Sequence, residues 1–199
     1  MDGDSGLGGG VVFAEEATRA AASRLGWAEY TTDWRSLIER DDIDIIDICT
    51  PGDSHAEIAI AALAAGKHVL CEKPPANTVA EAAAMAKAAE KAVGRSMVAF
   101  NYRRVPALAL AQQLVAAGEL DAVRHVRAVY LQDWIVDPSF PLVWRLQKDK
   151  AGAGALADIG SHIIDTAQFV TGQHIVGVTG LTETFVKERP VPETEGWAR

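Results

Sequence analysis

Residues 43–74 read IDIIDICTPGDSHAEIAIAALAAGKHVLCEKP, and they specify most of the architecture expected for this chain. The apolar run at 43–49 has the length of a buried strand, and the alanine-rich run at 55–65 has the length of a helix that Gly66 can end. A second apolar run, 67–71, follows directly. A strand, a helix and a strand joined by short connections form a βαβ unit, so the two strands are predicted to lie parallel in one sheet.

The alternation of helices and strands extends through the first hundred residues. The further predicted elements are a helix at 15–25 that Gly26 ends, a helix through Arg40 capped by Asp33 or Thr32, a helix from Thr78 to about Val93, and a strand at 97–100. The apolar majority of these strands is typical of a parallel sheet that helices cover on both faces.

The second half of the chain has a different pattern. Helices are predicted at 106–118 and 155–170, and alternating apolar residues predict strands of the antiparallel type at 124–130 and 176–186. The expected fold class is therefore α/β: an incomplete Rossmann-type parallel sheet over residues 1–103, followed by a partial α+β domain with a mainly antiparallel sheet over residues 104–199.

Charge and hydropathy exclude several classes of partner. The formal net charge is −8 and no basic stripe is present, which argues against nucleic acid and anionic membranes as partners. No apolar stretch approaches the roughly 20 residues that span a bilayer, and the amino terminus has no secretory pattern. The two cysteines, Cys49 and Cys71, are too few for a disulfide scaffold, so we expect reduced thiols and a cytoplasmic location.

Polar residues follow the predicted strands at their carboxyl ends, where parallel sheets bind ligands. Lys73 stands directly after the strand at 67–71. Its ammonium group can donate a hydrogen bond to a substrate hydroxyl or a cofactor amide, and partial desolvation would favour proton transfer. The alternative is a surface ion pair between Glu72 and Lys73, with Pro74 starting a helix.

The predicted helix at 155–170 carries Asp158 and His162, which are four residues apart and thus neighbours on one helical face. Asp165 lies three residues beyond His162. A histidine beside a carboxylate suits general acid–base chemistry. The alternatives are a surface pair or a core histidine that an aspartate satisfies. No third ligand is evident for zinc, so no metal site is predicted.

These segments together resemble the glucose–fructose oxidoreductase, inositol dehydrogenase and rhizopine-catabolism (Gfo/Idh/MocA) family, over about residues 26–189. The shared pattern is Thr50-Pro51 with His55, Ala65-Gly66-Lys67-His68-Val69-Leu70-Cys71-Glu72-Lys73-Pro74, Asn101-Tyr102-Arg103-Arg104, Trp144-Arg145, and Asp158 with Gly160-Ser161-His162 and Asp165. The order and spacing of the pieces carry the resemblance more than any one of them does. The stretches 130–134 and 185–190 are similar to the sugar-oxidising branch.

The resemblance implies a nicotinamide cofactor, NAD with NADP possible, and hydride transfer at a secondary hydroxyl of a sugar or cyclitol. It implies catalytic roles for Lys73, His162 and Asp158. Cofactor contacts would come from Thr50, Pro51, His55, Glu72, Lys73, Asn101, Trp144 and Arg145, and substrate contacts from Lys73, Tyr102, Asp158 and His162. Residues 1–103 would be a partial NAD(P)-binding domain, and residues 104–199 a partial substrate-binding and oligomerisation domain. Lys73 and His162 would then face each other across one pocket.

The sequence departs from the family pattern at both ends. The Gly-x-Gly-x-x-Gly turn after a first strand is absent, and the glycines at 6–10 do not follow a predicted strand. Later strands of the second domain are also absent, so we expect a fragment whose parent forms a homo-oligomer. Two alternatives remain open: a relative that cleaves glycosides through transient oxidation, and a truncated, non-catalytic relic or cofactor-sensing protein.

Overall fold

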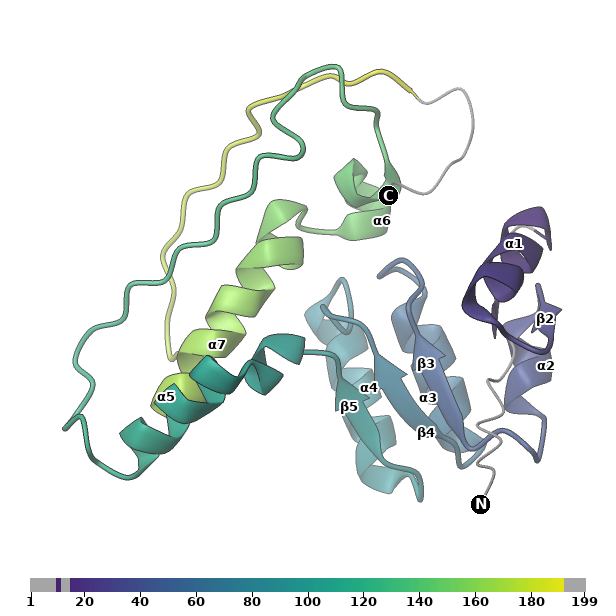
Figure 1. Cartoon of the computed structure of the whole chain (residues 1–199), viewed down its shortest axis with the longest axis horizontal. Helices are drawn as coiled ribbons and strands as arrows, with labels where there is room; N and C mark the ends of the chain where they lie inside the picture. Colours follow the sequence, from purple (N-terminus) through teal and green to yellow (C-terminus); the bar gives the residue numbers. More distant parts are fainter. Residues whose placement is uncertain (1–9, 12–14, 192–199) are drawn as a thin grey trace. The chain divides into compact units, whose positions relative to one another are not determined.

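The computed structural model describes residues 10–11 and 15–191 of the 199-residue chain (Figure 1). The chain divides into two compact units between Val98 and Ala99. Within the described ranges, no helix is both long and apolar enough to cross a bilayer.

The first unit alternates strands and helices, as predicted for most of its length, although strands at 10–11 and 30–31 were not predicted. Its elements are β1 (Gly10–Val11), α1 (Glu15–Leu25), β2 (Tyr30–Thr31), α2 (Trp34–Ile38), β3 (Ile45–Ile48), α3 (His55–Ala64), β4 (His68–Cys71), α4 (Val79–Lys91) and β5 (Ser96–Val98). All paired strands are parallel, in a two-stranded sheet β1-β2 and a three-stranded sheet β3-β4-β5. The glycines at 6–9 lie outside the described residues.

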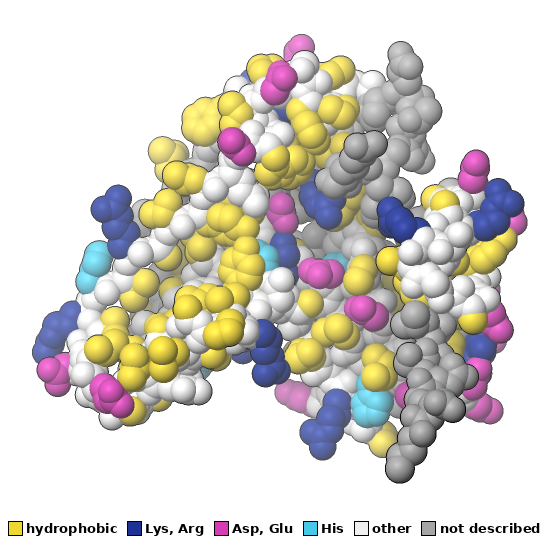
Figure 2. All heavy atoms as spheres, in the orientation of Figure 1, with side chains coloured by type: hydrophobic (Ala, Val, Ile, Leu, Met, Phe, Trp, Pro, Cys, Tyr) yellow, Lys and Arg dark blue, Asp and Glu magenta, His cyan; other side chains and the backbone are white. Residues whose placement is uncertain are grey.

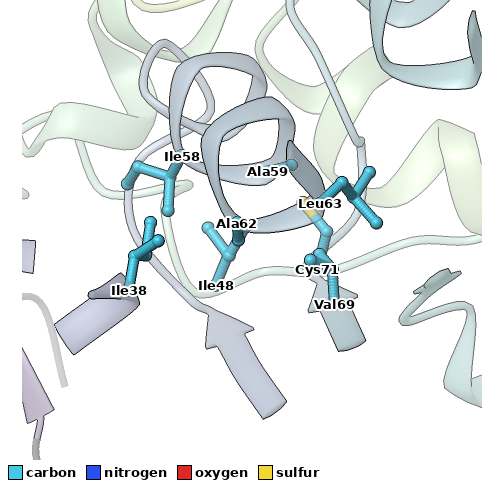
Figure 3. Packing of buried hydrophobic residues seen from close by; sticks show 8 residues of the cluster. All are labelled: Ile38, Ile48, Ile58, Ala59, Ala62, Leu63, Val69 and Cys71. Carbon is cyan, nitrogen blue, oxygen red and sulfur yellow. The ribbon is translucent and has the colours of Figure 1, made fainter. Parts of the chain in front are cut away.

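The hydrophobic core of this unit lies between α3 and one face of the three-stranded sheet (Figure 3). Ile48 of β3 is 2 % exposed and packs with Ala59 and Ala62 of α3. Side chains of α4 pack against the same cluster, so both helices cover one face. Ile45 and Met97 point to the other face of the sheet and are 61 % and 53 % exposed. Helices therefore cover one face of this sheet and not both faces, as had been predicted.

The helix boundaries follow from local chemistry. Gly26 and Gly66 take φ values of +74° and +80° directly after α1 and near the end of α3, as their role in ending helices requires. Thr78 and Glu81 form a reciprocal capping box at the start of α4. Ser54 precedes α3 but does not cap it, because its hydroxyl binds the preceding turn instead.

The second unit is built on helices. Its elements are η1 (Asn101–Arg104), α5 (Pro106–Ala116), η2 (Trp144–Leu146), α6 (Lys148–Ala151), the π-helix η3 (Leu156–Gly160) and α7 (Ser161–Thr171). Helix α5 packs against α7. Gly172 ends α7 with φ +68°, as expected from its position.

The predicted antiparallel sheet is not formed in the described part of this unit. Residues 124–130 and 176–186 are extended, but no strand ladder joins them (Figure 1). Their apolar side chains lack cover: Val129, Val178 and Phe185 are 62–90 % exposed, and Figure 2 shows hydrophobic side chains gathered over this region. Alternation sets which side of a strand is apolar, but a sheet also needs partner strands, and none packs here.

Candidate active site

The loops that follow β3 and β4 lie together at the carboxyl edge of the three-stranded sheet. The pairing of these strands extends into the second loop, because the Glu72 N–H donates to the Ile48 carbonyl at 2.9 Å. The Ser54 hydroxyl lies 2.7 Å from Thr50 Oγ1 and donates to the Pro51 carbonyl at 2.8 Å, which fixes the turn after β3. Adjacent parallel strands thus present both loops at the edge where such sheets bind ligands.

Lys73 lies at this edge with a half-buried side chain. Its backbone N–H donates to Glu72 Oε2 at 3.0 Å. The Glu72 carboxylate is therefore engaged by the main chain of its own loop, which orders the turn that carries the lysine.

His55 lies between the two loops. Its side chain is buried, with 2 % of the residue exposed. Nε2 lies 2.7 Å from the Thr50 carbonyl oxygen, and Nδ1 lies 3.0 Å from the Pro74 carbonyl oxygen. Both ring nitrogens therefore face the main chain, and the ring bridges the two loops.

The two loops also meet at Gly52. This glycine is buried, and a Cβ atom added to it would stand 2.7 Å from Oδ1 of Asn77. A larger residue here would displace the Asn77 side chain, so the glycine after Pro51 allows close packing of the turn against the loop that precedes α4.

His162 lies in the second unit, in an aromatic cluster. The residue is 8 % exposed at the first turn of α7. Its ring stacks on Tyr102, with centroids 4.2 Å apart and planes at 17°, and meets Phe100 edge-on at 6.4 Å. The imidazole is thus held between side chains of the segment that enters η1.

A chain of hydrogen bonds leads away from Tyr102. Its hydroxyl lies 2.6 Å from that of Tyr130, which in turn accepts from Gln132 Nε2 at 3.2 Å. The hydrogen bond to Tyr130 raises the pKa of Tyr102, and the charge of Asp158 acts in the same direction. Asp158 is therefore close enough to act on the tyrosine whose ring covers His162.

Arg103 and Asp165 form a two-pronged ion pair in the same unit. Arg103 Nε donates to Asp165 Oδ2 at 2.9 Å, and the Arg103 terminal nitrogen donates to Oδ1 at 2.5 Å. The guanidinium also lies over the rings of Phe100 and Phe169, 5.7 and 5.5 Å from their centroids. The contact to Asp165 raises the pKa of Arg103 further above its ordinary value, so the cation persists.

The remaining predicted cofactor residues occupy the same unit. Asn101 is the exposed first residue of η1. The guanidinium of Arg145 lies 4.5 Å from the centroid of the Trp144 ring in η2. Trp144 Nε1 is buried and has no hydrogen-bond acceptor among the described residues.

Within each unit, the structure brings together residues that are far apart in the sequence. Thr50, Pro51, His55, Glu72 and Lys73 share one edge of the first unit, and Tyr102, Asp158 and His162 share one cluster of the second. The sequence did not single out Tyr130 or the pairing of Arg103 with Asp165. Among residues 10–11 and 15–191, no three His, Cys, Asp or Glu side chains gather as metal ligands, and Cys49 and Cys71 are free thiols.

Both halves of the chain match family profiles. Residues 11–100 match an oxidoreductase family with an NAD-binding Rossmann fold, and residues 108–197 match the C-terminal domain of Gfo/Idh/MocA proteins. The levoglucosan dehydrogenase of Pseudarthrobacter phenanthrenivorans is 48 % identical over 176 residues, which are 88 % of this chain and 45 % of that protein.

Solved structures agree with these matches. An oxidoreductase domain protein from Kribbella flavida superposes with a TM-score of 0.90 at 67 % identity, over 94 % of this chain and 49 % of that one. A levoglucosan dehydrogenase in complex with NADH and levoglucosan also gives a TM-score of 0.90, at 45 % identity, over 93 % of this chain and 50 % of that one. The chain spans about half the length of the relatives it matches. It belongs to the Gfo/Idh/MocA family of NAD-binding oxidoreductases.

Proposed function

We propose that this chain carries the reaction residues of an NAD-dependent dehydrogenase that oxidises a secondary hydroxyl of a sugar. The observation that carries the proposal is the position of Lys73, directly after β4 and beside the loop that follows β3. The family supplies the cofactor class, and the named relative in complex with NADH and levoglucosan supports an anhydrosugar or a similar cyclic polyol as substrate.

At the edge of the first unit, the cofactor is proposed to contact four of the five residues that the resemblance assigns to it there. Thr50, Pro51, Glu72 and Lys73 are half-buried on the two loops, so each is partly exposed at the edge where parallel sheets bind ligands. The nicotinamide, when bound, accepts a hydride from the substrate carbon. Asn101, Trp144 and Arg145 are proposed to reach the cofactor from the second unit, and the buried Trp144 Nε1 is a donor suited to such a contact.

The proton of the reacting hydroxyl needs a separate route. Oxidation of the alcohol to a ketone releases one hydride from carbon and one proton from oxygen. Lys73 is proposed to hold the hydroxyl, and His162 to accept the proton. The stacking of Tyr102 on the imidazole fixes the plane of His162, and Asp158 orients the substrate beside it.

Reduction of NAD⁺ in the presence of levoglucosan tests the proposal. We expect Lys73→Ala and His162→Ala each to lower kcat by about 10²–10⁴-fold, the usual contribution of a positioned acid or base. Lys87→Ala, on the exposed face of α4, is the matched control and should leave the rate unchanged. If no NAD⁺ is reduced, calorimetry with NADH distinguishes two outcomes. NADH binding without turnover would favour a cofactor sensor, and the absence of both binding and turnover would contradict the dehydrogenase proposal.

The cellular setting belongs to the same proposal. Free thiols at Cys49 and Cys71 are compatible with a reducing cytoplasm. We also propose a homo-oligomer, since exposed apolar side chains line the extended segments of the second unit. Light scattering at several concentrations tests this, and a mass that stays monomeric would contradict it.

A further inference from the structure

We propose that His55 is a positioning residue that ties the loop after β3 to the loop carrying Lys73. It would thereby hold the lysine at the carboxyl edge of the sheet without touching substrate itself. The effect on catalysis rests on the proposed function, but the bridge between the two loops is argued from contacts within the first unit alone.

The two contacts of the ring join segments that no strand pairing joins. Thr50 is five residues before His55 and Pro74 is nineteen residues after it, and each contributes a carbonyl oxygen. A carbonyl oxygen only accepts, so each contact is a hydrogen bond only when the facing ring nitrogen carries a proton. The contact to Thr50 is local, whereas the contact from Nδ1 to Pro74 is the one that reaches the Lys73 loop.

Burial makes this bridge rigid. His55 begins α3, and the following residues Ala56, Ile58 and Ala59 are all buried. The ring therefore leaves a helix that is anchored in the core, and it has little freedom to follow a moving loop. Because Pro74 is bonded directly to Lys73, fixing the Pro74 carbonyl restricts the backbone from which the lysine side chain extends.

Close packing at Gly52 gives independent support for a fixed Lys73 loop. The turn after β3 packs closely on Asn77, because a Cβ atom added to Gly52 would stand 2.7 Å from Asn77 Oδ1 and displace that side chain. The loop that carries Lys73 is therefore held at Pro74 by a hydrogen bond and at Asn77 by packing. These contacts, at Pro74 and at Asn77, fix the path of the loop backbone on both sides of Pro75.

A pair of amide substitutions separates the two ring nitrogens. The side-chain nitrogen of asparagine occupies the place of Nδ1, and that of glutamine occupies the place of Nε2. His55→Asn can thus donate to the Pro74 carbonyl and leave the Thr50 carbonyl without a partner on residue 55, and His55→Gln does the reverse. We expect the backbone amides of Glu72, Lys73, Ala76, Asn77 and Thr78 to exchange with deuterium about tenfold faster in His55→Gln than in the parent chain, the ratio expected for one net hydrogen bond, and near the parent rate in His55→Asn.

Helix α4 is the internal reference for this exchange experiment. A change confined to the Lys73 loop of His55→Gln supports positioning. Equal acceleration in the loop and in α4, or the same effect in both variants, would show a general packing role and overturn the proposal, as would no effect in either variant.

Nitrogen NMR of the unsubstituted chain does not depend on how the variants fold. We expect a slowly exchanging proton on Nδ1 of His55, and an unprotonated Nδ1 would overturn the bridge to Pro74. If the chain turns over sugar, His55→Gln should lower kcat at least tenfold more than it changes KM. If it does not turn over sugar, the exchange and NMR results still decide the structural claim, and only the dehydrogenase proposal fails.

Discussion

Replacement of Arg103 by methionine is expected to destabilise the second unit out of proportion to the exposure of the arginine. The Arg103 side chain is 48 % exposed, but the Asp165 side chain that it neutralises is only 8 % exposed. Removal of one partner from a fully buried pair costs about 3–5 kcal/mol, mainly because a buried charge is left uncompensated. Water screens the exposed half of this pair, so we expect a loss of about 2 kcal/mol.

A double-mutant cycle measures the coupling directly. Asp165→Asn keeps the shape of the side chain and removes its charge, and alone it should cost about 1–2 kcal/mol because the guanidinium loses its carboxylate partner. The combination of Arg103→Met with Asp165→Asn should cost less than the sum of the single changes by about 1 kcal/mol or more. Urea denaturation followed by circular dichroism, together with amide exchange in α7, reports these free energies of unfolding.

An exposed pair in the same unit provides the control. Lys187 and Glu183 form an ion pair with side chains 66 % and 58 % exposed. Their cycle should give a coupling of about 0.5 kcal/mol or less. If the cycle of Arg103 and Asp165 gives no more than this control, burial of the carboxylate does not set the strength of the pair. The arginine would then act mainly through its contacts with the aromatic rings.

Three further outcomes follow from the first unit. Ile48→Ala should lower the free energy of unfolding in urea by about 2–5 kcal/mol, whereas Ile45→Ala, on the 61 % exposed side of the same strand, should change it by less than about 0.5 kcal/mol. Gly94→Ala should lower thermal stability by about 3 kcal/mol, because its Cβ atom would stand 2.1 Å from the Lys67 carbonyl oxygen and the backbone must move. Burial and the charge of Glu72 raise the pKa of Cys71 from 9.0 to about 12, so the stability that this thiol contributes is present below pH 9.0 and is lost as pH rises toward 12. Its reaction with a thiol-specific disulfide reagent near pH 8 should be at least tenfold slower in the folded chain than in urea, and equal rates would contradict this.

The first unit was predictable because its signals are local. The helices at 15–25 and 55–65 have glycine stop signals, Gly26 and Gly66, and the strands at 43–49 and 67–71 are mainly apolar runs. The parallel arrangement then follows from connection length alone. The prediction of strands at 124–130 and 176–186 was wrong because alternation describes a single segment, whereas a sheet depends on partners that the segment does not encode.

The site was predictable as a set of residues but not as a set of contacts. The sequence singled out His55, but its spacing from Thr50 and Pro74 does not show that one ring faces both carbonyls. Arg103 and Asp165 are 62 residues apart, and a pairing over that distance depends on how η1 packs against α7. Tyr130 ends a segment predicted as a strand and begins a stretch similar to the sugar-oxidising branch, but neither observation indicates its hydrogen bond to Tyr102.

The relation of Asp158 to His162 shows where periodicity misleads. Their spacing of four residues was read on an α-helix, but residues Leu156–Gly160 form a π-helix, whose hydrogen bonds close at five residues. Both residues still act on one partner, because His162 stacks on the ring of Tyr102 while the charge of Asp158 raises the pKa of its hydroxyl. Asp158 and His162 thus belong to two different helical elements, and what they share is an interaction with Tyr102, which the α-helical spacing of the sequence does not predict.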